Sequence, residues 1–199
     1  MGKLYDAIDD RLADWIGRQR LFFVGTAPSG PDGHVNVSPK GGIESFRIVD
    51  ATTVAYLDFV GSGVETISHL RDNRRIVVMF CAFEGPPRIV RLHGRGSVTQ
   101  VGDPAFEDLL QRLDFGGIEA AADGARSVIT IELSRIADSC GYGVPTMRYE
   151  GPRSQQLAWI QSRLRRDGPA GVLAYVEARN RESIDALPGI EADLLPDRG

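Results

Sequence analysis

Six short runs of apolar and β-branched residues, most of them separated by tight turns, constrain the fold of this chain more than any other feature. They lie at residues 20–27, 34–42, 52–60, 74–83, 86–101 and 127–136. Candidate helices are few and irregularly placed between them, which disfavours repeated strand–helix–strand units and a parallel sheet. The pattern favours a mainly β fold, a six-stranded antiparallel barrel with helices at its periphery.

Helical patterns occur at both ends of the chain and twice between the strands. An N-terminal amphipathic helix is predicted because five apolar residues would share one face: Leu4, Ile8, Leu12, Trp15 and Ile16. Residues 61–73 predict a short helix, and Asp103 with Pro104 predicts a helix start before residues 105–114.

The sequence changes character beyond residue 142. Residues 155–166 and 170–183 predict two helices, and residues 184–199 a weakly structured tail. We therefore expect a barrel domain over residues 1–142 and a C-terminal helical extension with its tail over residues 143–199, packed on the barrel.

Composition excludes several classes of function. The net charge of −4 does not favour nucleic acid as a partner, and no apolar run is long enough to cross a membrane. Two cysteines, Cys81 and Cys140, do not make a disulfide framework, so a cytoplasmic location is expected. His34, His69 and His93 lack metal-ligand spacing, and no metal site is expected.

Two loops have the composition of an anion site. In "SPKGG", Ser38 and Lys40 end a strand before two glycines, and either bind an anion or form a solvated hairpin end. In "GSGVET", glycines flank Ser62 just before a predicted helix, whose N-terminus would attract a phosphate. The alternative there is a capping box, because Ser62 and Glu65 have the required spacing.

Basic and aromatic residues supply further candidates. One face of the strand predicted at residues 86–101 carries four basic residues: Arg88, Arg91, His93 and Arg95. This face is either a cationic wall beside an acidic ligand or a solvated outer wall of the barrel. In "SCGYGVP", Tyr142 could lie flat on a ring, whereas Cys140 is interpreted as a packing residue.

The order of "VNVSPKG", "YLDFVGSGVETISHLRDNRR" and "RIVRLHGRG" resembles that of the pyridoxamine 5′-phosphate oxidase-like family of FMN-binding split barrels, over roughly residues 1–140. The resemblance implies a split β-barrel and an FMN held at a homodimer interface by both subunits. It implies that Asn36, Val37 and Ser38 run beside the flavin. It assigns the remaining cofactor contacts to Lys40, Ser62, Gly63, Thr66, Arg88 and Arg91, and Tyr142 joins them as a ring contact.

The chain also departs from the oxidase of that family. The oxidase has a basic pair near the positions that Glu65 and Thr66 occupy in this chain. It has a glutamine at the position of Ile89. We therefore expect an FMN-dependent oxidoreductase whose small-molecule substrate is not pyridoxamine phosphate. No catalytic residue is identifiable. The alternatives are a deazaflavin-dependent reductase on the same barrel and a non-catalytic carrier of flavin or haem.

Overall fold

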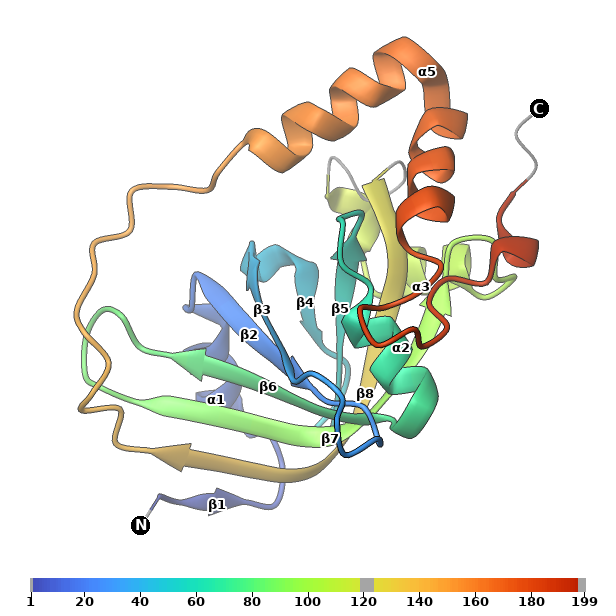
Figure 1. The fold of residues 1–199 in the computed structure, drawn as a ribbon. Helices are drawn as coiled ribbons and strands as arrows, with labels where there is room; N and C mark the ends of the chain where they lie inside the picture. Colours follow the sequence, from blue (N-terminus) through green and yellow to red (C-terminus); the bar gives the residue numbers. More distant parts are fainter. Residues whose placement is uncertain (1, 119–123, 197–199) are drawn as a thin grey trace.

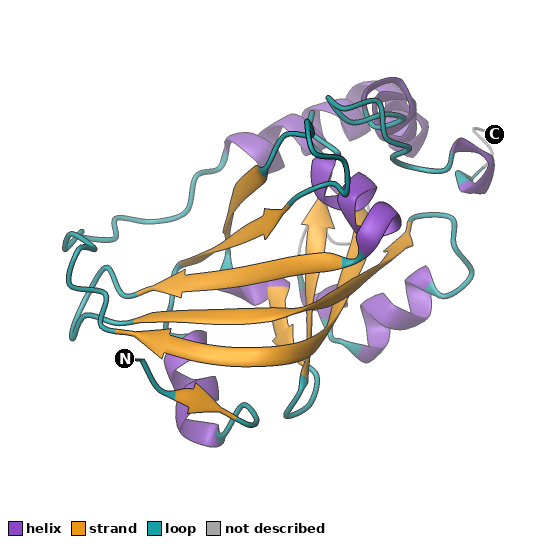
Figure 2. Cartoon of the chain, turned by 60° about the horizontal axis from the view of Figure 1, so that its bottom comes forward, coloured by secondary structure: helices purple, strands orange, loops and turns teal. Residues whose placement is uncertain are grey.

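The computed structural model of the protein describes residues 2–118 and 124–196. Within these ranges, an antiparallel sheet of eight strands curls into a half-barrel, with helices around its rim (Figures 1 and 2). The strands are β1 (Leu4–Tyr5), β2 (Leu21–Thr26), β3 (Asn36–Gly41), β4 (Phe46–Ile48), β5 (Thr53–Phe59), β6 (Arg75–Cys81), β7 (Ile89–Gln100) and β8 (Ala125–Ser139). The helices are α1 (Asp10–Gly17), α2 (Glu65–Asn73), α3 (Phe106–Arg112) and α5 (Gln155–Arg179), with 3₁₀ turns η1 (Ile43–Ser45), η2 (Phe115–Gly117) and η3 (Ala192–Leu194).

The strand order β3-β2-β6-β7-β8-β5-β4 places β3 and β4 at the two edges of the sheet, while β1 pairs with β8. The long strands β7 and β8 form its middle. A bulge between His93 and Gly94 shifts their register, and a bulge increases the local bend and twist of a strand pair. Glycine is needed there, because a Cβ on Gly94 would lie 2.3 Å from the carbonyl oxygen of Glu132.

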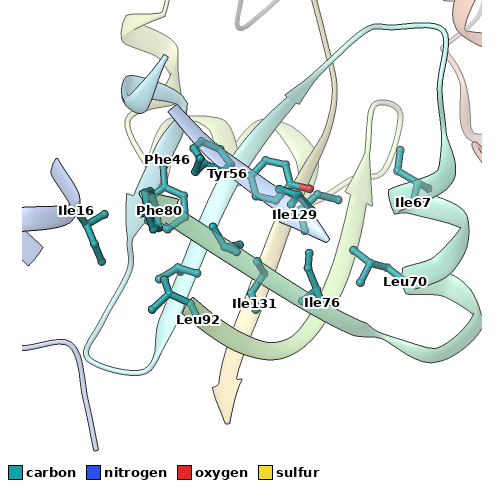
Figure 3. Close-up of a cluster of buried hydrophobic side chains, with 14 of the residues drawn as sticks. Ile16, Phe46, Tyr56, Ile67, Leu70, Ile76, Phe80, Leu92, Ile129 and Ile131 are labelled. Carbon is teal, nitrogen blue, oxygen red and sulfur yellow. The ribbon is translucent and has the colours of Figure 1, made fainter. Parts of the chain in front are cut away.

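Aromatic and aliphatic side chains fill the concave side of the sheet. Ile16 of α1 lies at one end of this cluster, and Ile67 and Leu70 of α2 lie at the other (Figure 3). Each fully buried ring contributes about 2 to 3 kcal/mol by leaving water. Four rings pack tilted or edge-on with centroids 5.2 to 5.8 Å apart: Phe22, Phe46, Tyr56 and Phe80.

The antiparallel barrel with peripheral helices is confirmed, but the prediction of six strands was wrong by two. The sheet also contains β1 and β4, which have two and three residues and are too short to show an alternating pattern. The N-terminal helix is shorter than predicted. Leu4 lies in β1 opposite Ala137, and α1 begins only after Asp9, whose carboxylate accepts a hydrogen bond from the Leu12 N–H at 2.8 Å.

The C-terminal helix α5 is bent at Gly168, which has φ 63° and ψ −171° and precedes Pro169. Glycine tolerates this conformation and proline cannot donate to the preceding turn, so the two predicted helices are the two halves of one bent helix. Residues 140–154 form a long connection that leads away from the sheet to α5 (Figure 1). Within the described residues, no helix has the length and apolar character needed to cross a membrane.

Candidate functional site

The two loops predicted to bind an anion are adjacent in the structure. Side chains two residues apart on a strand share a face, so Asn36, Ser38 and Lys40 all face inward from β3. Asn36 Nδ2 donates to Oγ1 of Thr66, in the first turn of α2, at 3.0 Å. Ser38 Oγ donates to Asn36 Oδ1 at 3.0 Å. The inner face of β3 therefore lies against the N-terminal end of α2. Val37, between these residues, points outward and is 63% exposed.

Lys40, which is partly exposed, belongs to a charge cluster with the buried residues Asp58 and Arg126. Its Nζ lies 2.7 Å from Asp58 Oδ1, and Arg126 Nε lies 2.7 Å from Oδ2 of the same carboxylate. Burial by itself would raise the pKa of Asp58, but the positive charges of Arg126 and Lys40 outweigh it and lower the pKa to about 2. Asp58 is therefore ionised at neutral pH, and two cations against one anion leave the cluster with one unit of net positive charge.

The loop between β5 and α2 adds backbone donors beside this cluster. Within the described part of the chain, the N–H groups of Gly61, Ser62 and Gly63, which we call the amide cradle, donate to no other group. Unpaired N–H groups near the start of a helix attract anions. The alternative capping box is wrong, because Val64 is the N-cap of α2 and no side chain of the described residues caps it. The Glu65 carboxylate instead lies next to Gly63, where it would repel an anion.

Arg91 does not join that site within one chain. Val90 and Leu92 are fully buried on the inner side of β7, so Arg91 between them points to the outer face of the sheet. There its Nη1 donates to Ser139 Oγ at 3.1 Å. Lys40 and Arg91 therefore lie on opposite faces of the sheet.

Arg88 and Tyr142 also lie away from the amide cradle. Arg88 Nη2 donates to the hydroxyl of Tyr5 at 2.6 Å and to Asp138 Oδ2 at 3.1 Å, so it secures the N-terminal segment. Tyr142 is 82% exposed and follows Gly141, which packs on the backbone of Arg88. Arg88 directly precedes β7 and Gly141 packs on it, so Arg88 and Tyr142 both belong to the end of β7 that carries the β6–β7 connection. This connection lies at the opposite end of β7 from α2 (Figure 1).

A buried histidine, His69, is linked to Asn36 through the hydroxyl group of Thr26. Asn36 Nδ2 also donates to Thr26 Oγ1 at 3.3 Å, and this oxygen lies 3.0 Å from Nδ1 of His69. Burial lowers the pKa of His69 more than nearby carboxylates raise it, so the ring is neutral at pH 7. Its Nε2 has no partner among the described residues. The hydrogen bonds from Asn36 through Thr26 to His69 therefore connect β3 to the buried face of α2.

Sequence reasoning missed Asp58 and Arg126, which decide the charge of the site. The signal for Asp58 was present, because it is a single carboxylate inside the apolar run "TTVAYLDFV". A charge inside a buried strand requires a partner. Its partners could not be chosen from the sequence, since Arg126 lies 68 positions away and many other cations were available.

Comparison with known proteins identifies the family. The family model for pyridoxamine 5′-phosphate oxidase matches residues 8–140, about two thirds of the chain. The chain belongs to the pyridoxamine 5′-phosphate oxidase family. A pyridoxamine 5′-phosphate oxidase family protein of Aspergillus flavus, ustO, is 45% identical to this family member over 144 residues. The match covers 72% of the chain but 56% of ustO, so the chain spans little more than half the length of that relative.

Similar solved structures are more distant in sequence. One is an FMN-binding protein from Syntrophomonas wolfei, with 12% identity and a TM-score of 0.45, covering 64% of this chain and 78% of the other. Another is an F420 reductase, with 18% identity and a TM-score of 0.42, covering 63% of this family member and 94% of the other chain.

Proposed function

We propose that this protein is an FMN-dependent oxidoreductase acting on a small organic molecule, with FMN held at a homodimer interface. One observation carries the proposal: the Lys40–Asp58–Arg126 cluster, with its net positive charge, adjoins the loop that carries the amide cradle, because Arg126 Nη1 donates to the Gly61 carbonyl oxygen. A phosphate monoester is close to dinegative at neutral pH, and backbone N–H groups with a lysine ammonium are its usual partners. The residues present therefore fit the phosphate end of FMN.

The roles of the chain's own residues follow from their geometry. The Lys40 ammonium has three N–H donors and gives one to Asp58, so others can reach the phosphate. Ser62 and Thr66 offer hydroxyl groups beside the amide cradle, and Asn36 and Ser38 would line the ribityl chain. A bound FMN supplies the two-electron chemistry, so the protein needs only to bind it, orient it and keep water from it.

The distribution of the remaining candidates supports a homodimer. Arg88, Arg91 and Tyr142 lie away from the amide cradle of their own chain. For these residues to contact the flavin, they would have to come from a second copy of the chain. Apolar side chains are also exposed along the edge strand β3: Val37 on its outer face is 63% exposed, and Val35, just before the strand, is 72% exposed. An exposed apolar strip on a sheet edge is typical of an interface. We place the dimer in the cytoplasm, where its two free cysteines, Cys81 and Cys140, stay reduced.

The first test is a set of binding titrations with FMN, riboflavin and a deazaflavin, in which the fluorescence of the flavin is the measured signal. We expect FMN to bind more tightly than riboflavin, which lacks the phosphate. The chain has two lysines, which offers a matched pair of variants. Lys40→Met should weaken FMN binding by about 10- to 100-fold, the loss of one charge-assisted contact. Lys3→Met should leave it unchanged. Absence of FMN binding would overturn the proposal, and tighter binding of the deazaflavin would favour the reductase alternative.

A second test separates an enzyme from a carrier. The flavin-loaded protein is mixed with NADH or NADPH in a stopped-flow instrument, and the bleaching and return of the flavin absorbance are followed with candidate acceptors. Reduction and reoxidation are expected for the oxidoreductase. A flavin that never cycles with any donor would identify a carrier. Light scattering gives the mass in solution, and a monomer would contradict the interface site.

A further inference from the structure

Asn180, at the C-terminal end of α5, is fixed deep in the molecule although it belongs to the segment after the barrel. It is fully buried. Its N–H donates to the Val176 oxygen at 2.8 Å, and its own carbonyl accepts from the Ile190 N–H at 2.7 Å. Gly189 packs so closely that a Cβ there would lie 2.2 Å from the Asn180 oxygen. The chain turns sharply at this point and passes beside α2 (Figure 1). Asn180 is therefore a rigid support.

The Asn180 side chain binds the loop that contains the amide cradle. Its Nδ2 donates to the Gly61 oxygen at 3.0 Å and lies 3.5 Å from the Ser62 oxygen. Its Oδ1 accepts from Arg126 Nη1 at 3.0 Å, which joins it to the charge cluster. At the other end of α5, Gln156 Nε2 donates to the Val60 oxygen at 3.1 Å. Side chains of the extension thus hold three consecutive carbonyl groups.

These three carbonyls determine where the amide cradle points. The peptide unit is planar and trans, so its C=O and its N–H point in opposite directions. The carbonyls of Val60, Gly61 and Ser62 share their peptide planes with the N–H groups of the cradle. Asn180 holds the Gly61 and Ser62 carbonyls, which directs the N–H groups of Ser62 and Gly63 away from it. Gln156 holds the Val60 carbonyl separately and so orients the Gly61 N–H. Glycine at two of the three positions makes such support necessary, because glycine loses the most conformational freedom on ordering.

We propose that Asn180 is a positioning residue for the phosphate end of the cofactor. It acts through the peptide groups of residues 60–63 and through Arg126, without touching the ligand. This inference rests on the proposed function. It assigns a role to the C-terminal extension, which lies outside the residues matched by the family model.

The test compares FMN with riboflavin in wild-type protein and in Asn180→Ala. The variant should lower FMN affinity by about 10-fold or more, the loss expected when hydrogen bonds that order a binding loop are removed. Riboflavin affinity should not change, because riboflavin has no phosphate for the cradle to hold. Glu191→Ala is the matched control. Its side chain ties the same tail to Arg71 at the far end of α2, so both affinities should stay at the wild-type values.

The outcomes separate the two proposals. Equal losses for FMN and riboflavin in Asn180→Ala, or no loss for either, would overturn the positioning role while leaving the flavoprotein assignment intact. Wild-type protein that binds neither flavin, or binds both equally, would overturn the phosphate site and this inference with it. If Asn180→Ala does not fold, Gln156→Ala decides. Gln156 is exposed and its loss should reduce the preference for FMN, whereas an unchanged preference refutes the inference.

Discussion

Replacing Asp58 by asparagine probes the charge cluster most directly. The carboxylate is 1% exposed and accepts hydrogen bonds from Lys40 and Arg126 on its two oxygens. Asparagine has nearly the same shape but no charge, and its amide nitrogen can only donate. The variant therefore leaves the buried Arg126 and the partly buried Lys40 without their anion, and turns a donor toward one of them.

The size of the effect follows from the pKa of Asp58. A change from the ordinary 3.8 to about 2 corresponds to about 2 kcal/mol in favour of the ionised folded state. Breaking a buried ion pair by removing one partner adds the cost of the unpaired charges, which brings the typical total to about 3 to 5 kcal/mol. Because the folded-state pKa is depressed, the contribution of Asp58 is complete above about pH 5. It is lost as the pH falls toward 2.

The loss of unfolding free energy is measured by urea unfolding at pH 7 and near pH 2.5, with tryptophan fluorescence as the signal. We expect Asp58→Asn to lose about 3 to 5 kcal/mol at pH 7 and clearly less at the lower pH. Adding Lys40→Met should restore part of the stability, because Arg126 is then the one cation of the cluster left without its anion. Asp108→Asn removes an exposed carboxylate from a 3.9 Å pair and should cost under about 0.5 kcal/mol. A loss below about 1 kcal/mol at pH 7, or one independent of pH, would refute the reasoning.

Three further outcomes are expected. Glu65→Gln should raise FMN affinity about 5-fold in a fluorescence titration by removing a like charge beside the phosphate, and an unchanged affinity would argue against an anion there. Gly94→Ala should cost about 2 to 4 kcal/mol in urea unfolding, since its Cβ would meet the Glu132 carbonyl, whereas Gly17→Ala, with open space around it, should be near neutral. His69 has a pKa below the usual 6.5, so its contribution is complete above that pH and is lost below it. His69→Gln should therefore flatten the dependence of Tm on pH between about 8 and 5, and a slope equal to that of wild type would exclude His69 as its source.

The fold could be predicted where local patterns are long enough to be periodic. Buried and more exposed residues alternate along β6 and much of β7. Asp103 marks the start of the segment that leads into α3, and its carboxylate accepts a hydrogen bond from the Ala105 N–H at 2.8 Å. β1 and β4 could not be predicted, since strands of two and three residues exist only because a neighbouring strand offers hydrogen bonds. The sequence predicted two helices where the structure has the two halves of the bent helix α5, and the break between them falls at Gly168 and Pro169.

The candidate site was predictable in part for the same reason. The inward face of β3 follows from alternation along the strand, and the two candidate anion loops are close together as the phosphate site requires. The grouping of Arg88 and Arg91 with Lys40 is not found within one chain, because the strand that carries Arg91 presents it on the other face of the curled sheet.

By itself, the sequence determined the strands of the barrel, the helix that follows the glycine loop and the membership of a family, because each depends on residues that are near one another along the chain. Only the tertiary structure decided what those residues contact. The carboxylate that holds Lys40 lies 18 positions away, and Asn180 reaches Gly61 across 119. Such contacts depend on the curvature of the sheet and the path of the C-terminal extension, and these are set by the packing of the whole core rather than by any local pattern.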